Sequence, residues 1–246
     1  MHYHVSPFGQ YNGSWKDAEK AYRQILRESE AVNLITVMRE PRSHLLSYYY
    51  YYIQPQTKKS IVEFLTEPQH AKDPLQQHLF NPLSAEFGVK KKIDLDYMLK
   101  TGLPNLTLVI LTEQFDESLM VMRRLLGWEM MDMTYSSMMK TKSGSRRFDG
   151  KPLVDSPHFE DLPEHVQKII DNKTELDRIL YAASEKEYQK RRDTVAQYLE
   201  ADLAEFQQLQ DVIKTYLIDN PSSKANVMYH NSNVYRTKEE SPMYEF

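Results

Sequence analysis

The segment "NLITVMREPRSHLLSYYYYYI", residues 33–53, decides the fold class of this chain. Residues 32–38 are apolar, β-branched and too few for a helix, so they predict a buried strand. Pro41 suits the first position of a helix, which we expect to continue through the tyrosine run. A second apolar run at 106–111, followed by a helix that Asp116 would cap, repeats this order. Two strand-to-helix units predict an α/β fold in which helices pack on a parallel sheet.

The length of 246 residues allows one large α/β domain with its own core. We expect this domain to cover residues 1–185, followed by a long amphipathic helix at 186–218. Apolar residues recur in that helix at spacings of three and four, from Tyr198 to Tyr216. Such a helix packs on its own domain or on a second copy, which would make a homo-oligomer. The polar tail at 219–246 has no periodicity, and we expect it to be disordered or extended.

Composition excludes several classes of function. The net charge of −4 provides no general positive field, which argues against a nucleic-acid binder. The absence of cysteine excludes disulfides and thiolate chemistry. No apolar run is long enough to span a membrane, and the N-terminus has no signal peptide. Three N-glycosylation patterns point to a secretory lumen, and they begin at Asn12, Asn105 and Asn172.

The first candidate site lies where the first strand meets its helix. In parallel α/β sheets, ligands bind at the carboxyl ends of strands, where the helix N-terminus favours an anion. Arg39 stands at that position, and its planar guanidinium suits phosphate oxygens. Ser47 follows eight residues later and could lean back towards the same anion. The alternative is that Arg39 ends the strand and pairs with Glu40 or another carboxylate.

Two motifs in this order resemble known sulfotransferases. The strand, Arg39-x-Pro41, Ser47 and the tyrosines resemble the segment that binds the 3′-phosphate of 3′-phosphoadenosine 5′-phosphosulfate (PAPS). The stretch "LVILTEQFDESLMVMRRLLGWEMMDMTY", residues 108–135, is similar to the galactose-3-O-sulfotransferase family. The resemblance covers roughly residues 1–185, and two shorter stretches fit it loosely, "NPLSAEFGV" at 81–89 and "LDRILY" at 176–181.

The resemblance implies a P-loop-NTPase-like three-layer sandwich around a parallel sheet. It also implies a Golgi enzyme that moves a sulfuryl group from PAPS to a hydroxyl of a galactose-containing glycolipid or glycan, without a metal. Arg39 and Ser47 would hold the 3′-phosphate. The acceptor hydroxyl needs a base, and a neutral imidazole suits that role near neutral pH.

The stretch "MHYHV" supplies the candidate bases, with His4 preferred and His2 second, as in a similar His-x-His-Val segment of related sulfotransferases. The alternative is a frayed terminus with two solvated histidines, and a metal site would need a third ligand. Arg146 and Arg147, in "SGSRR", could clamp the nucleotide phosphates or an acidic glycan. A solvated basic loop is the alternative for these two arginines.

One expected feature of the family is missing from the sequence. Sulfotransferases hold the 5′-phosphosulfate with a lysine-bearing Gly/Ser/Thr loop, and nothing before Arg39 fits it. The early Lys16 and Lys20 fall on a predicted amphipathic helix instead. We therefore expect either a fragment of a longer, membrane-anchored enzyme or a non-catalytic remnant that binds glycans or proteins through its long helix. A P-loop NTPase is set aside because no Gly-x-x-x-x-Gly-Lys-Ser/Thr occurs.

Overall fold

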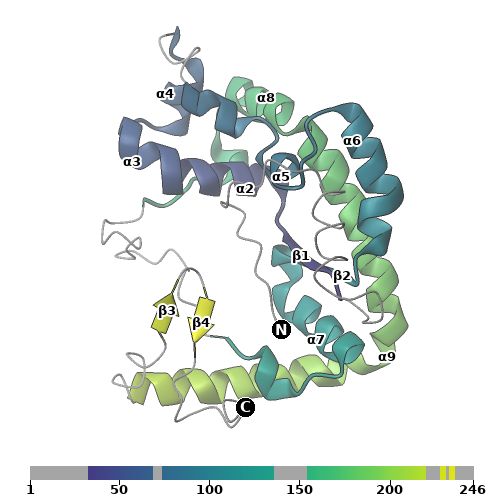
Figure 1. Ribbon diagram of the computed structural model, residues 1–246. Coiled ribbons are helices and arrows are strands. Elements are labelled where there is room, and N and C mark those ends of the chain that lie inside the picture. Colours follow the sequence, from purple (N-terminus) through teal and green to yellow (C-terminus); the bar gives the residue numbers. More distant parts are fainter. Residues whose placement is uncertain (1–32, 69–73, 136–153, 220–227, 231–232, 236–246) are drawn as a thin grey trace.

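The computed structural model describes residues 33–68, 74–135, 154–219, 228–230 and 233–235 (Figure 1). This part of the chain is mostly helical and contains a short parallel sheet and a long C-terminal helix. The α/β class and the parallel pairing predicted from the sequence are thereby confirmed.

The parallel sheet has two strands in the described part of the chain, β1 (Ile35–Met38) and β2 (Leu108–Leu111). Ile35 pairs with Leu108 and Met38 with Leu111, so the two strands end together. All four residues of β2 are buried, as an apolar run predicts. In β1, by contrast, Val37 is 51% exposed. The expectation of a wholly buried first strand was therefore wrong, because the helices α7 (Phe115–Leu126) and α9 (Glu175–Asp219) pack chiefly on β2.

Helices make up most of the described chain (Figure 1), and several short 3₁₀ turns lie between them. Two segments, Tyr49–Ile53 and Met98–Gly102, are π-helical. The α-helices are α2 (Pro41–Tyr48), α3 (Gln54–Thr57), α4 (Ile61–Thr66), α5 (Pro82–Glu86), α6 (Lys92–Tyr97), α7 (Phe115–Leu126), α8 (Glu164–Lys173) and α9 (Glu175–Asp219).

The first strand-to-helix unit differs in detail from its prediction. Pro41 does occupy the first turn of α2. The single helix expected through the tyrosines is instead α2, a π-helical turn over Tyr49–Ile53, and α3. Tyr49 and Ile53, the first and last residues of this turn, both lie in the core, where each is at most 1% exposed. A π-turn widens the helix by one residue and rotates the side chains that follow it.

The second strand-to-helix unit, β2 followed by α7, differs from its prediction at the start of the helix. The residue before α7 is Gln114, and Asp116 lies inside its first turn rather than capping it. The Asp116 carboxylate accepts a hydrogen bond from the Tyr135 hydroxyl at 2.6 Å instead. Gly127 ends the helix with a φ of +68°, a left-handed conformation that glycine adopts without a Cβ penalty.

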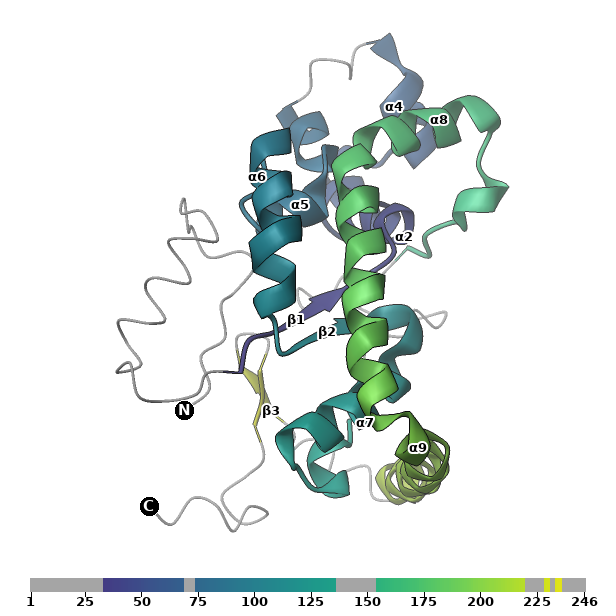
Figure 2. The ribbon, with the colours of Figure 1, turned by 90° about the vertical axis from the view of Figure 1, so that its right-hand side faces the viewer.

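The long helix α9 begins at Glu175, before the expected start at residue 186, and passes that position without a break. Its first part passes along β1 and β2, beside α6 (Figure 2). It then changes direction, and its later part runs along the lower edge of the view beneath α7 (Figure 1). One helix thus contacts β2, α5, α6 and α7 and connects both ends of the described structure.

Two apolar clusters form the core. The larger one surrounds β2 and contains the inner faces of α7 and α9, for example Met120, Leu180 and Phe206. The smaller one lies between α2, α4 and α8 and includes Leu45, Phe64 and others. The carboxyl end of β1 leads from the larger cluster directly into α2, which packs in the smaller one. The strand-to-helix junction is therefore held from both sides.

In the tail, β3 (Met228–His230) pairs antiparallel with β4 (Asn233–Tyr235). The remaining tail residues lie outside the described chain. Among the helices that the structure describes, none combines the length and apolarity needed to cross a membrane.

Candidate functional site

Arg39 lies where the sequence predicted it, between the last residue of β1 and the first turn of α2. Its side chain is half-buried. Among the described residues, no carboxylate forms an ion pair with it. The pairing of Arg39 with Glu40 considered above is not observed, because the Glu40 carboxylate caps α2 by accepting the Ser43 N–H at 2.7 Å. Arg39 thus remains available for an anion.

His44 connects the surroundings of Arg39 with those of Ser47. Burial, together with the nearby positive charge of Arg39, lowers the pKa of His44 to about 4. His44 and Ser47 are three residues apart in α2, so they share one face of the helix. His44 is therefore neutral near pH 7, and it lies between the two predicted phosphate ligands in sequence. The direct convergence of Arg39 and Ser47 on one anion stays a prediction.

The N-terminus of α2 offers less to an anion than a free helix end would. The Glu40 N–H donates to Glu113 Oε1 at 2.9 Å, and the Ser43 N–H donates to the Glu40 carboxylate. Pro41 has no N–H, so Arg42 carries the remaining first-turn donor. The sequence-based expectation that free helix N–H groups attract the anion needs correction. Here an anion would depend on side chains, chiefly the Arg39 guanidinium.

Glu113, at the carboxyl end of β2, connects three elements at this edge of the sheet. Its Oε1 accepts the Glu40 N–H, and its Oε2 accepts the hydroxyl of Tyr181 on α9 at 2.8 Å. Burial acts to raise the pKa of Glu113, but the Glu40 N–H and the Tyr181 hydroxyl outweigh it and hold the pKa below its usual value. Burial and the same contact raise the pKa of Tyr181. Glu113 is therefore ionised and Tyr181 is a hydrogen-bond donor at neutral pH.

After Glu40 and Glu113, a third carboxylate at this edge of the sheet is that of Glu185, which is close to Glu113. Burial and the negative charge of Glu113 raise the pKa of Glu185. Within the part of the chain that the structure describes, the strand ends thus combine Arg39, which forms no ion pair there, with several carboxylates. No group of three or more His, Cys, Asp or Glu side chains that could hold a metal ion occurs within the described ranges.

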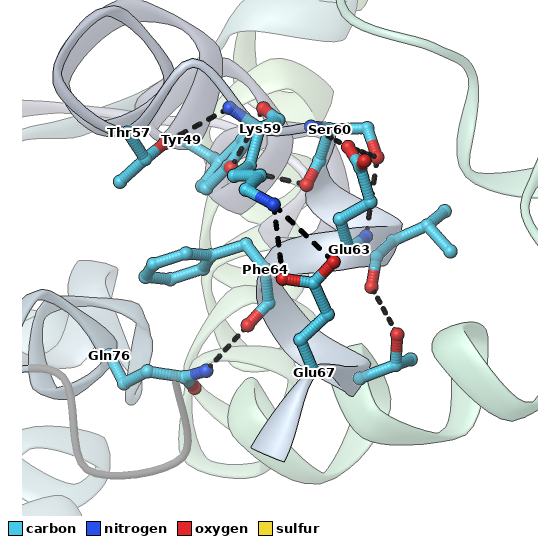
Figure 3. Close-up of polar contacts among 10 residues, drawn as sticks. Tyr49, Thr57, Lys59, Ser60, Glu63, Phe64, Glu67 and Gln76 are labelled. Atoms are coloured by element: carbon cyan, nitrogen blue, oxygen red, sulfur yellow. Dashed lines mark hydrogen bonds and ion pairs between the residues drawn. The ribbon is translucent and has the colours of Figure 1, made fainter. Parts of the chain in front are cut away.

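The five tyrosines after Ser47 mainly build structure. Tyr49 is fully buried against Phe64, and its hydroxyl donates to the carbonyls of Lys59 and Ser60 (Figure 3). Tyr50 accepts the Ile61 N–H at 3.4 Å. Tyr49 is thus a core residue, whereas the other four tyrosines are half-buried.

The same close-up shows why the chain after the tyrosines is rigid. Ser60 and Glu63 form a reciprocal capping box at the start of α4. Lys59 pairs with Glu67, and Gln76 donates to the Phe64 carbonyl (Figure 3). These contacts fix α4 beneath the tyrosine run and leave it no evident ligand-binding role.

A groove of about 500 Å³ lies elsewhere, between α9 and the π-helical end of α6. Leu99, Ile179 and Ala183 line it, and Arg178 and Lys186 stand at its margin. Neither Arg39 nor Ser47 contributes to it.

Four of the predicted site residues, His2, His4, Arg146 and Arg147, lie outside the described residues. Conversely, Glu113, Tyr181 and His44 were not singled out from the sequence. A signal for Glu113 was present, because a polar residue directly after a buried strand marks the carboxyl edge of a parallel sheet. Tyr181 gives no such signal, since its position opposite Glu113 arises only from the packing of α9.

A family model described as galactose-3-O-sulfotransferase matches residues 20–153, more than half of the chain. The match includes Arg39, Ser47 and Glu113. It places the chain among the sulfotransferases. The chain belongs to the galactose-3-O-sulfotransferase family, as its two motifs predicted.

No curated protein and no solved structure matches the chain significantly.

Proposed function

We propose that this protein transfers a sulfuryl group from PAPS to a hydroxyl of a galactose-containing glycolipid or glycan. Family membership supports sulfuryl transfer in general. The observation that carries the proposal further is Arg39, a half-buried arginine at the carboxyl end of a parallel strand with no carboxylate partner in the described part of the chain. An unpaired guanidinium at this position is suited to a phosphate.

In this proposal Arg39 and Ser47 hold the 3′-phosphate of the nucleotide. Arg39 provides a charged fork of donors, and Ser47 provides one hydroxyl. Arg146 and Arg147 assist at the remaining phosphates. Because Glu40 and Glu113 are already engaged with backbone donors, Arg39 is free to act on the nucleotide.

The chemical step breaks the bond between sulfur and the phosphate oxygen of PAPS and forms a new bond between sulfur and the acceptor oxygen. His4 takes the proton of the acceptor hydroxyl, with His2 as the second candidate, and adenosine 3′,5′-bisphosphate leaves. A neutral imidazole near pH 7 can accept this proton. Positive groups at the phosphates stabilise the charge that develops on the leaving oxygen.

The wider setting belongs to the same proposal. The catalytic domain would be a three-layer sandwich around a parallel sheet, in a Golgi enzyme that is anchored in the membrane. Asn105 is exposed, which is compatible with N-glycosylation in a secretory lumen. Asn172 is less suitable, because Thr174 of its pattern is fully buried and bonded to the Ile170 carbonyl.

Calorimetric titration with adenosine 3′,5′-bisphosphate tests the proposal. We expect micromolar binding by the wild-type chain and a loss of about 100-fold in Arg39→Ala, since a charge-assisted contact to phosphate disappears. Ser47→Ala should lose about fivefold, as one neutral hydrogen bond is removed.

Arg42→Ala is the matched control, because Arg42 lies three residues away but pairs with Asp171 at 2.7 Å and stacks on Phe159. Its nucleotide affinity should stay near that of the wild type. Undiminished binding by the Arg39→Ala and Ser47→Ala variants would show that these residues do not hold the phosphate.

The second candidate function is a non-catalytic module that binds a glycan or a protein through α9. Its support is the exposure of Val212 (65%) and Tyr216 (57%) near the end of this helix. A well-folded wild-type chain that does not bind adenosine 3′,5′-bisphosphate would favour this module over the transferase. Self-association through α9 would appear in the same preparation as a concentration-dependent mass in sedimentation.

A further inference from the structure

The Glu113 carboxylate is placed where it controls the backbone of Arg39. The Glu40 N–H that it accepts belongs to the peptide unit joining Arg39 to Glu40. That unit is planar, so orienting its N–H also orients the carbonyl and the Cα of Arg39. The other carboxylate oxygen is held by the Tyr181 hydroxyl on α9. One side chain thus fixes the ends of both strands against the long helix.

The position of this carboxylate needs an explanation, because a negative charge beside an anion site opposes binding. Glu113 is an exposed residue, so simple core packing does not require it. The carboxylate accepts the Glu40 N–H, the Tyr181 hydroxyl and the hydroxyl of the adjacent Thr112, and these hydrogen bonds disperse its charge and give it one fixed orientation. These features indicate that its geometric role outweighs its electrostatic cost.

Tyr181 is a firm support for this carboxylate. Its side chain is 9% exposed, and its helix is tied to the start of β2 by Arg191, which donates to the carbonyls of Thr107 and Leu106. The start of β2 and the residue that follows its end are therefore both bonded to α9. Because α9 cannot shift without breaking these bonds, the orientation of Glu113 is set by the fold and not by solvent.

We propose that Glu113 and Tyr181 act as positioning residues that aim Arg39 at the 3′-phosphate and so make the site selective for 3′-phosphorylated nucleotides. This inference rests on the proposed function, in which Arg39 holds that phosphate. Neither residue contacts the nucleotide. Removing either one loosens the Arg39 backbone, and the contact that suffers is the one made by Arg39.

The experiment compares two ligands, adenosine 3′,5′-bisphosphate and adenosine 5′-monophosphate, by calorimetry on the whole chain. The measured quantity is the ratio of their dissociation constants. A variant that merely unfolds in part loses binding sites for both ligands alike, so the ratio does not move. A positioning defect weakens the bisphosphate selectively.

We expect Glu113→Ala to weaken bisphosphate binding about tenfold and monophosphate binding less than about twofold. Tyr181→Phe removes the hydroxyl that donates to the Glu113 carboxylate, and it should weaken bisphosphate binding about threefold. Glu113→Gln should restore most of the selectivity, since its amide oxygen still accepts the Glu40 N–H and its NH₂ can donate to the Tyr181 oxygen.

Glu117→Ala is the matched control. Glu117 also accepts a tyrosine hydroxyl from α9, that of Tyr188, at 2.8 Å, but it makes no contact with the Glu40 backbone. In the Glu117→Ala variant, the ratio of the dissociation constants for the bisphosphate and the monophosphate should equal that of the wild type.

Three results would overturn the inference. An unchanged ratio in Glu113→Ala shows that the carboxylate does not aim Arg39. A Glu113→Gln variant that binds the bisphosphate more tightly than the wild type shows that the charge, and not the geometry, matters. Wild-type protein that binds no bisphosphate removes the proposed function as well, a result distinct from the first two because it appears before any substitution is made.

Discussion

Glu113 and Glu117 lie four residues apart, and each accepts the hydroxyl of a tyrosine on α9, yet they stabilise different parts of the molecule. The Glu113 contact, with Tyr181, is at the carboxyl edge of the sheet and extends to the backbone beside Arg39. The Glu117 contact, with Tyr188, lies between α7 and α9 and includes Arg192 at 2.8 Å. The first holds a strand end in place, whereas the second holds two helices together.

The difference in surroundings decides what each contact contributes. Tyr188 is 1% exposed and lies in the main apolar cluster, so loss of Glu117 would leave buried polar groups without a partner. Glu113 is an exposed residue, and its bond to the Glu40 N–H lies at the surface, where water can replace it, whereas the Tyr181 hydroxyl belongs to a residue that is 9% exposed. The same pair of residue types therefore serves stability in one place and site geometry in the other.

The largest effect on stability is expected for Glu117→Ala. It removes the acceptor for the Tyr188 hydroxyl and for the Arg192 guanidinium, which should lower the free energy of unfolding by about 2–3 kcal/mol. Urea denaturation followed by circular dichroism measures this loss. A change below about 0.5 kcal/mol, the range of ordinary surface substitutions, would show that the helix interface does not depend on Glu117.

A second contact between α7 and α9 adds a pH dependence. Asp202 on α9 accepts two hydrogen bonds from Arg124 and lies 3.4 Å from Arg123, and its side chain is 4% exposed. The hydrogen bonds from Arg124, against the opposing effect of burial, hold the pKa of Asp202 below its usual value of 3.8. The stabilisation is therefore present above the unfolded-state pKa and is lost as the pH falls through the lower folded-state pKa.

We expect Asp202→Asn to lower the free energy of unfolding by about 1–2 kcal/mol at pH 7, a value reduced by the partial exposure of the arginines. The difference from the wild type should begin to shrink as the pH falls below about 4, where Asp202 of the unfolded chain binds a proton. It should vanish only as the pH falls through the lower pKa of folded Asp202. Urea titrations from pH 7 down to pH 3 measure it. The control is Glu164→Gln, in a surface pair with Lys168, which should change stability by less than about 0.5 kcal/mol.

The smallest effect on stability is expected at the strand ends. Glu113→Ala should lower the free energy of unfolding by about 1 kcal/mol, and its coupling with Tyr181→Phe in a double-mutant cycle should be about 0.5–1 kcal/mol. A cost for Glu113→Ala equal to that for Glu117→Ala would erase the distinction between the two contacts. Such a result would assign Glu113 to general stability.

Several features of the fold could be predicted from residues close together in the sequence. The apolar runs gave both strands, Pro41 gave the start of α2, and Gly127 agrees with the end of α7. The extents of elements were less predictable. The π-helical turn over Tyr49–Ile53 is one example, because nothing in the local sequence distinguishes it from an ordinary α-helix.

The candidate site also has features that the sequence predicted and features that it did not. Arg39 and Ser47 were identifiable because their spacing and the preceding strand are properties of a continuous segment. The hydrogen bonds of Glu40 and Glu113 at the N-terminus of α2 could not be identified in this way, because the Glu113 contact joins residues 73 positions apart. The roles of His2, His4, Arg146 and Arg147 stay predictions.

By itself the sequence determined the class of the fold, the family and the arginine at the end of the first strand, because all three depend on short-range patterns of residue type. Only the tertiary structure decided that Arg39 has no carboxylate partner in the described chain, and that Glu113 bonds to its backbone neighbour and to Tyr181. Hydrogen bonds between distant residues depend on how α9 packs across the sheet. That packing is a property of the whole chain and cannot be read from any one segment.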